Sequence, residues 1–189
     1  MPRRFPQLMF TDGVRRAQER NGSRQSAARM EVQERDDWTL GSAEREFIAS
    51  RDSFYLATVN EEGWPYVQFR GGPAGFLRVL DERTLAYADF RGNRQLISTG
   101  NLGSSGKAAL ILLDYPTRTR LKVLARAVVV PAEEEPQLIA ALEDPSYRAR
   151  VERAVVLRVE AFDWNCPQHI TPRYTLAEIQ AGLAEGRAS

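Results

Sequence analysis

Residues 64–102 of this chain read WPYVQFRGGPAGFLRVLDERTLAYADFRGNRQLISTGNL. The stretch combines strand-like runs, a glycine-rich bend at Arg70–Pro73, and a polar loop ending at Asn93–Gln95 before a short helix. Glycines free the backbone, and arginines and amides beside them suit a phosphate and a flat polar ring. The stretch therefore predicts both a β-rich fold and a binding site.

Outward from this stretch, residues alternate with the period of two that is typical of β-strands. The predicted strands are Phe54–Asn60, Trp64–Arg70, Phe76–Leu80, Thr84–Asp89, Ala108–Asp114, Arg120–Val130 and Ala154–Phe162. The run Ala108–Asp114 is continuously apolar, which indicates a strand buried on both faces. The short turns favour antiparallel closure into a small barrel of six to seven strands, mainly β with flanking helices, over βαβ winding.

Helical patterns flank the strands. Before the strands, they predict a helix capped by Asp12, with Val14, Ala17 and Ala28 on its inner face, and a second helix capped by Ser42. Between the strands, they predict one or two helical turns over Asn93–Ser98 and helices over Glu133–Leu142 and Pro145–Arg153. A closing helix starts with a capping box from Thr175 to Glu178. We therefore divide the chain into an N-terminal helical arm (1–41), a barrel domain (42–175) and a C-terminal helix and tail (176–189).

Composition excludes several classes of protein. The chain has 26 basic and 25 acidic residues, so it lacks the basic excess of a nucleic-acid binder. Cys166 is the single cysteine, which excludes an internal disulfide, and His169 is the single histidine, so a structural zinc site has too few ligands. No signal peptide or membrane-spanning run is visible in the sequence, so we expect a cytoplasmic protein.

The segment Gly100–Lys107 (GNLGSSGK) superficially suggests a phosphate-binding P-loop. The pattern fails because Asn101 stands where the first glycine belongs and Ala108 where Ser or Thr belongs. We expect a loop that leads into the strand at Ala108.

Two groups of residues are candidates for a ligand site. Gln68 and Arg70 alternate along one strand face, and Asn93–Gln95 lie where a helix would offer free N–H groups to a phosphate. The alternatives are that Arg70–Pro73 form only a bulge and turn, and that Asn93 only caps the helix. The tail DWNCPQHITPRY, 163–174, either seals the barrel or covers the ligand.

Three segments together resemble a known family: PYVQFRGG (65–72), YADFRGNRQLIS (87–98) and RLKVLARAVVV (120–130). They resemble the pyridoxamine 5′-phosphate oxidase family, whose fold is the FMN-binding split barrel. RGGPAGFLRVLD, ADFRGNRQ and DWNCPQHITPR are more closely similar to its subgroup of predicted flavin-nucleotide-binding proteins. The resemblance covers residues 42–175 and implies a homodimer that holds FMN between its subunits.

The resemblance also implies which residues bind FMN. Carried over position by position, they are Gln68, Arg70, Gly71, Gly72, Pro73, Ala88, Asp89, Arg94, Gln95, Arg120, Trp164 and Arg173. The amide of Asn93, at the expected helix start, joins them as a candidate phosphate ligand. The phosphate-binding pair of the family falls on Arg94 and Gln95, where Gln95 replaces a cation. Pro73 stands where the true oxidases carry a lysine, and the helix reading EEEPQLIAAL (133–142) lacks their Tyr/Arg/Ser series. These departures argue against pyridoxamine phosphate as the substrate.

The expected function is that of an FMN-binding oxidoreductase acting on another small molecule. The flavin supplies the redox chemistry, so no catalytic nucleophile is required. A non-catalytic flavin-binding or carrier protein is the alternative from another class. A split-barrel protein that binds haem or a deazaflavin is a third hypothesis.

Overall fold

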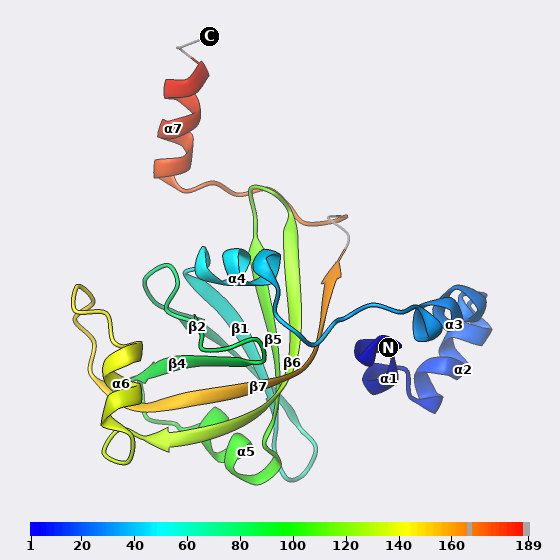
Figure 1. Ribbon diagram of the computed structural model, residues 1–189, viewed down its shortest axis with the longest axis horizontal. Helices are drawn as coiled ribbons and strands as arrows, with labels where there is room; N and C mark the ends of the chain where they lie inside the picture. Colours follow the sequence, from blue (N-terminus) through cyan, green and yellow to red (C-terminus); the bar gives the residue numbers. More distant parts are fainter. Residues whose placement is uncertain (166–167, 187–189) are drawn as a thin grey trace.

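The computed structural model describes residues 1–165 and 168–186. In these residues, strands hydrogen-bond into one seven-stranded antiparallel sheet in the order β2-β1-β5-β6-β7-β4-β3 (Figure 1). The strands are β1 (Ser53–Val59), β2 (Pro65–Gly71), β3 (Arg78–Val79), β4 (Thr84–Phe90), β5 (Lys107–Asp114), β6 (Thr119–Pro131) and β7 (Val151–Asn165). The predicted mainly β fold with flanking helices is confirmed.

Alternation along each strand separates an inner face from an outer one. On β5, Ala108, Leu110 and Leu112 are buried in the main core, while the residues between them, Ala109 and Ile111, are half-buried on the outer face. The prediction that this strand is buried on both faces was therefore wrong. One face of this apolar strand instead packs into the core, and the other is an apolar surface on the outside of the sheet.

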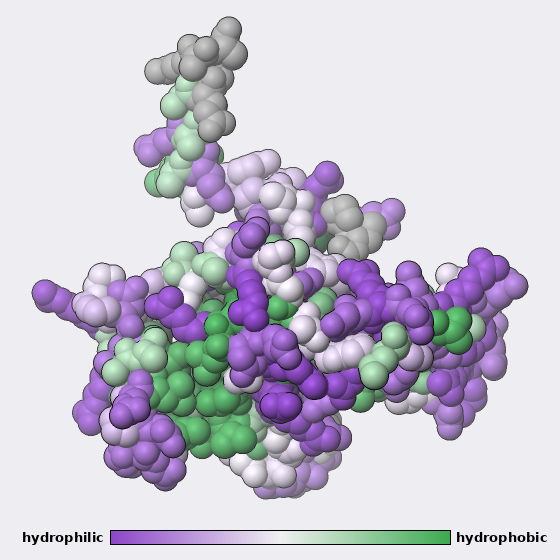
Figure 2. Space-filling view, viewed as in Figure 1, coloured by the Kyte–Doolittle hydropathy of each residue, from purple (hydrophilic) through white to green (hydrophobic). Residues whose placement is uncertain are grey.

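A second, smaller apolar cluster lies on the other side of β4 and β7. It joins Ala88 and Ala154 to Ile139 and Leu142 of helix α6 (Pro136–Leu142). Figure 2 shows apolar side chains gathered on the sheet beside α6. This helix covers the outside of the barrel.

The prediction of a helix over Pro145–Arg153 was wrong. Strand β7 begins at Val151 and pairs with β4 on one side and β6 on the other. Hydrogen bonds to two neighbouring strands satisfy this backbone better than an isolated short helix, which explains why tertiary pairing prevails. Glu152 and Arg153 consequently lie on a strand.

Helix α5 (Ile97–Ser105) begins later than predicted and includes the segment expected to be a loop. Leu102 packs into the core, and the buried Asn101 Nδ2 donates a 2.9 Å hydrogen bond to Thr58 Oγ1. Gly106, at φ 62°, ends the helix in the left-handed conformation that favours glycine. Tertiary contacts thus hold a sequence of weak helical propensity as a helix.

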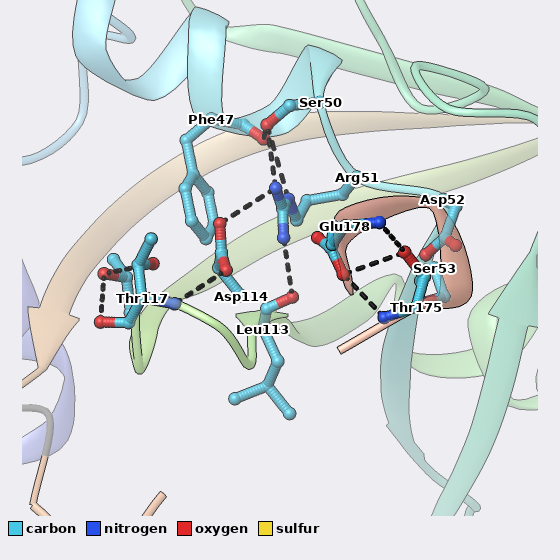
Figure 3. Close-up of polar contacts among 11 residues, drawn as sticks. Phe47, Ser50, Arg51, Asp52, Ser53, Leu113, Asp114, Thr117, Thr175 and Glu178 are labelled. Carbon is cyan, nitrogen blue, oxygen red and sulfur yellow. Dashed lines mark hydrogen bonds and ion pairs between the residues drawn. The ribbon is translucent and has the colours of Figure 1, made fainter. Parts of the chain in front are cut away.

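Helix α4 (Ser42–Ala49) is capped by Gly41 and not by Ser42, and Glu44 accepts a 3.0 Å hydrogen bond from the Gly41 N–H. Figure 3 shows how Arg51 ties the end of this helix to the sheet. Its guanidinium donates to the Leu113 carbonyl at 3.2 Å and lies 3.0 Å from the Asp114 carboxylate. The helix is therefore fixed over the end of β5.

The N-terminal arm contains three helices, α1 (Arg4–Met9), α2 (Asp12–Arg20) and α3 (Arg24–Val32), beside the barrel (Figure 1). Thr11, and not Asp12, caps α2, which buries none of its residues. The positive φ of 71° at Gly22 accompanies the break before α3, where Ala27 is buried in place of Ala28. The predicted inner face was therefore wrong.

A buried ion-pair cluster attaches this arm to β7. Asp37, 1% exposed, accepts a 3.2 Å bond from Arg3 Nε and a 2.7 Å bond from the Arg4 N–H. Arg3 also donates a 2.6 Å bond to Asp163 on β7. One carboxylate thus caps α1 and fixes the arm.

The C-terminal helix α7 (Leu176–Gly186) stands away from the barrel (Figure 1). Its predicted capping box is confirmed, because the Thr175 N–H donates to Glu178 at 2.7 Å and the Glu178 N–H donates to Thr175 Oγ1 at 3.2 Å, both drawn in Figure 3. Across the described ranges, no helix has the length and apolar character needed to span a membrane.

We predict that Asp37→Ala destabilises the protein by about 3 kcal/mol, because removing one partner leaves the buried Arg3 charge poorly compensated. Urea unfolding measures the loss, and limited proteolysis within residues 1–41 should accelerate. The matched control is Glu34→Ala, whose side chain is 81% exposed and should change little. Equal stability of the Asp37 variant and the wild type would contradict the anchoring role.

We predict that Tyr87→Phe leaves the fold intact and raises its stability. The Tyr87 hydroxyl is buried in the core with no partner among the described residues, and burial raises its pKa above the usual range. An unpaired buried hydroxyl costs about 1–3 kcal/mol, which phenylalanine removes without changing the ring contacts. Thermal unfolding checks the change, with Tyr147→Phe as an exposed control. A clear loss of stability would show that the hydroxyl has a partner.

Candidate functional site

A polar pocket opens where the sheet leaves β2 and β4 unpaired with each other. We call it the split pocket; its volume is about 220 Å³. It is lined by residues of β2, β4, the loop before α5, α5 itself and the start of β7: Tyr66, Gln68, Arg70, Asp89, Phe90, Gly92, Asn93, Arg94, Gln95, Leu96, Ile97, Ser98, Thr99, Glu152 and Arg153.

Strand β2 contributes alternate residues to this pocket. Gln68 pairs with Leu56 and Arg70 with Phe54, both of which face the core, so the polar side chains lie on the inner face. Because β2 is an edge strand, they reach the opening of the barrel. Ser98 Oγ of α5 donates a 3.1 Å hydrogen bond to Gln68 Oε1.

Asp89 is the deepest charged group of the pocket, with an exposed fraction of 5%. Its two oxygens lie 2.6 Å from Arg70 Nη1 and 3.4 Å from Arg153 Nη1. This carboxylate therefore connects β2, β4 and β7 across the split. Two arginines are held rigidly at the pocket floor by one buried anion.

A second carboxylate, Glu152, lies at the same wall. It contacts Arg153, Arg94 at 3.6 Å and Arg91 at 3.8 Å. Arg153 also donates a 3.3 Å hydrogen bond to Thr99 Oγ1. The pocket thus carries a connected network of arginines, carboxylates and hydroxyls.

The loop before α5 has an unusual backbone. Arg94 and Leu96 have φ of 61° and 55°, a left-handed conformation that costs energy for residues other than glycine. Asn93 Oδ1 accepts a 3.1 Å bond from the Gln95 N–H and does not cap α5. The alternative that Asn93 only caps this helix was therefore wrong, and the loop presents the largely exposed Arg94 beside the pocket.

This arrangement is chemically suited to an anion. Arg70, Arg94 and Arg153 supply planar donors, and the Ser98 and Thr99 hydroxyls lie in the first turn of α5, where free N–H groups and the helix dipole add positive potential. Among the described residues, no group of His, Cys, Asp and Glu side chains is arranged to hold a metal ion.

The glycines of the predicted site have a packing role. A Cβ on Gly71 would lie 2.9 Å from Phe69, and one on Gly72 would lie 2.8 Å from Phe76. Gly72 donates its N–H to the Asp52 carbonyl at 2.9 Å, so β2 ends there in a turn. Gly71, Gly72 and Pro73 do not line the split pocket, and Ala88 packs on the outer side of β4.

Three other predicted residues lie at the far end of the barrel. Trp164, near the opposite end of β7 from Arg153, donates a 2.8 Å bond from Nε1 to Glu44 and packs on Phe47. Arg120, the second residue of β6, lies next to Leu121, which pairs with Trp164, and the Arg173 guanidinium lies 5.0 Å from the Tyr115 ring. These residues do not join the split pocket of their own chain. Cys166 and Pro167 of the predicted tail lie outside the described residues.

Sequence reasoning missed several pocket residues, notably Tyr66, Ser98, Thr99, Glu152 and Arg153. Tyr66 follows from the alternation of β2, since it precedes Gln68 by two positions. Glu152 and Arg153 were hidden by the incorrect helix, because their approach to Asp89 depends on the pairing of β7 with β4.

Comparisons with known proteins agree with the fold described above. The family model described as pyridoxamine 5′-phosphate oxidase matches residues 40–165. A protein from Lactobacillus delbrueckii with the provisional name pyridoxamine 5′-phosphate oxidase is 26% identical, with a TM-score of 0.50, over 66% of this chain and 93% of its own. A search of curated proteins finds no match.

Two further solved structures share the fold. An FMN-binding protein from Syntrophomonas wolfei is 16% identical, with a TM-score of 0.50, over 65% of this chain and 83% of its own. HupZ from Group A Streptococcus is 16% identical, with a TM-score of 0.51, over 71% of this chain and 98% of its own. The sheet order, the split between β2 and β4 and the family model lead to one conclusion: the chain belongs to the pyridoxamine 5′-phosphate oxidase family and has its split-barrel fold.

Proposed function

We propose that this protein is an FMN-binding oxidoreductase whose flavin phosphate binds in the split pocket. The observation that carries the proposal is the arginine and hydroxyl network around Arg94, Arg153 and Thr99, in a chain of this family. When bound, FMN supplies the electron transfer, and the protein supplies binding and orientation. The described neighbour from Syntrophomonas, an FMN-binding protein, shares the fold.

The residues that line the split pocket fit FMN. A phosphate monoester accepts charge-assisted hydrogen bonds, and Arg94 with the Thr99 hydroxyl offers donors for them in the pocket. Flavin also presents amide and carbonyl groups along one ring edge. Gln68 and Arg70 face the same space, and Arg70 Nε is buried with no partner among the described residues. That donor set is suited to a ring edge.

We propose that one chain forms only part of the site and that a homodimer completes it. The pocket volume of about 220 Å³ is below the roughly 300–1,000 Å³ of sites that hold a drug-sized ligand. Beside β2, an outer face is lined by apolar residues: Tyr55, Ala57, Val67, Ala109, Ile111 and Leu124, with Phe5 and Met9 of α1. A second copy on this outer face lies next to the edge strand that carries Gln68 and Arg70.

The far-end residues support the same assembly. Arg120, Trp164 and Arg173 gather at the end of the barrel remote from their own split pocket. A twofold dimer exchanges equivalent surfaces between its copies, and we propose that these residues reach the partner's pocket in it. Arg120 Nε is buried without a partner in the described part of one chain, which leaves a donor available.

We propose that the substrate is a small molecule other than pyridoxamine phosphate. Helix α6, where the true oxidases carry substrate-phosphate residues, packs Ile139 and Leu142 against the outside of β4 and β7. The pocket lining contains no residue of α6. Anaerobic addition of NADH or NADPH to the FMN-loaded protein distinguishes an oxidoreductase, whose flavin absorbance bleaches, from a carrier, whose absorbance does not change.

The purified protein should bind FMN and show a flavin absorption spectrum, with FMN released on denaturation. Arg94→Ala should weaken FMN binding by about tenfold, since a hydrogen bond to a charged group contributes about 1.5–3 kcal/mol. Riboflavin, which lacks the phosphate, should bind both forms alike. Fluorescence titration measures both ligands, and Arg16→Ala on the exposed surface of α2 is the control. A protein that ignores added FMN refutes the proposal.

Val67→Glu should convert the dimer into a monomer and weaken FMN binding. The side chain of Val67 is 60% exposed on the outer face, so one chain tolerates the charge while a buried dimer interface does not. Light scattering after gel filtration gives the mass. Val32→Glu, at a 74% exposed site on α3, is the matched control. A variant that stays dimeric removes the outer face from the interface.

A further inference from the structure

Glu152 has a position in the split pocket that phosphate binding alone does not explain. It is the second residue of β7, and its side chain is 15% exposed at the wall shared with Arg153. A carboxylate at the wall of an anion site opposes the ligand by like charge. We therefore ask how this carboxylate affects the pocket arginines that would bind the ligand.

Both oxygens of this carboxylate are engaged by arginines. Oε2 lies against Arg153 Nη2, while Oε1 lies 3.6 Å from Arg94 Nη1 and 3.8 Å from Arg91 Nε. Glu152 thus contacts Arg94, which we propose to bind the phosphate, and two further arginines beside it. Without a ligand, Glu152 is their counter-anion.

The other pocket carboxylate, Asp89, is held differently. The Asp89 side chain is 6% exposed, and its contact to Arg70 is 2.6 Å. Arg94, in contrast, is 58% exposed, and its contact to Glu152 is 3.6 Å. The Asp89 contacts are a fixed part of the barrel, whereas the pair of Glu152 with Arg94 is loose.

Breaking the ion pair of Glu152 with Arg94 costs little free energy, so a ligand can replace Glu152 as the partner of Arg94. Exposed ion pairs contribute about 0.2–1 kcal/mol. A phosphate monoester carries up to two negative charges and several acceptor oxygens, so it binds arginine more strongly than one carboxylate does. An incoming phosphate is therefore able to take Arg94 from Glu152.

We propose that Glu152 is an internal competitor for the phosphate site: it holds Arg94 and Arg153 in the empty pocket, and a phosphate monoester replaces it on Arg94. This proposal deepens the proposed function and rests on it. Glu152 then sets how tightly the pocket retains its phosphate-bearing ligand. It favours a ligand that brings more negative charge than the carboxylate it displaces.

The test is Glu152→Gln, which keeps the shape and removes the charge. FMN should bind at least about threefold more tightly, as expected for the loss of a competing partly exposed ion pair, and riboflavin should be unaffected. The matched control is Glu160→Gln on the same strand, because Glu160 pairs with Arg4 outside the pocket. Fluorescence titration gives the affinities, and circular dichroism checks folding.

A second measurement does not require flavin. Inorganic phosphate should raise the melting temperature of the Glu152→Gln protein more than that of the wild type, and Glu152→Asp serves if the glutamine variant misfolds. Weaker FMN binding by Glu152→Gln, or an equal change for riboflavin, would overturn the proposal. If neither protein binds FMN but the phosphate response grows, the flavin assignment fails and the competitor role stands. An unchanged phosphate response overturns the competitor role.

Discussion

The ion pairs of Asp89 with Arg70 and Arg153 are the constraint on which both the barrel and its pocket depend. β2 lies at one edge of the sheet and β4 near the other, so no ladder of backbone hydrogen bonds joins them. The 2.6 Å contact of Arg70 with Asp89 spans that opening. Removing Asp89 would leave the nearly buried Arg70 charge without its carboxylate, at a cost of about 3–5 kcal/mol. The opening between β2 and β4 is therefore polar, and this ion pair bridges it.

The same constraint explains why a polar site exists in a barrel with an apolar core. Arginines paired with the buried Asp89 line the pocket floor, and the loop before α5 leaves Arg94 as a more exposed, less closely paired cation at the rim. A fixed floor with an exchangeable rim suits a ligand with a flat ring and a phosphate. Rigid donors orient the ring, and adjustable ones follow the phosphate.

Much of the fold was predictable because strand alternation is local. The pairing of β1 with β2 and the shared face of Gln68 and Arg70 follow from a period of two. Local reasoning failed at Pro145–Arg153 and at α5, where pairing with distant strands and burial of Leu102 override the pattern. Glu152 and Arg153 were missed for this reason. Arg153 is 64 positions from Asp89, and only the β4–β7 register brings them together.

The sequence by itself determined the antiparallel β architecture, the inward alternation of β2, and the family to which the chain belongs, because these depend on local periodicity and ordered motifs. The tertiary structure decided which charges meet. It placed Asp89 between two arginines, set Glu152 against Arg94, and moved Trp164, Arg120 and Arg173 to the far end. Such contacts depend on the register between strands and on closure of the barrel, and no single segment of the sequence determines either.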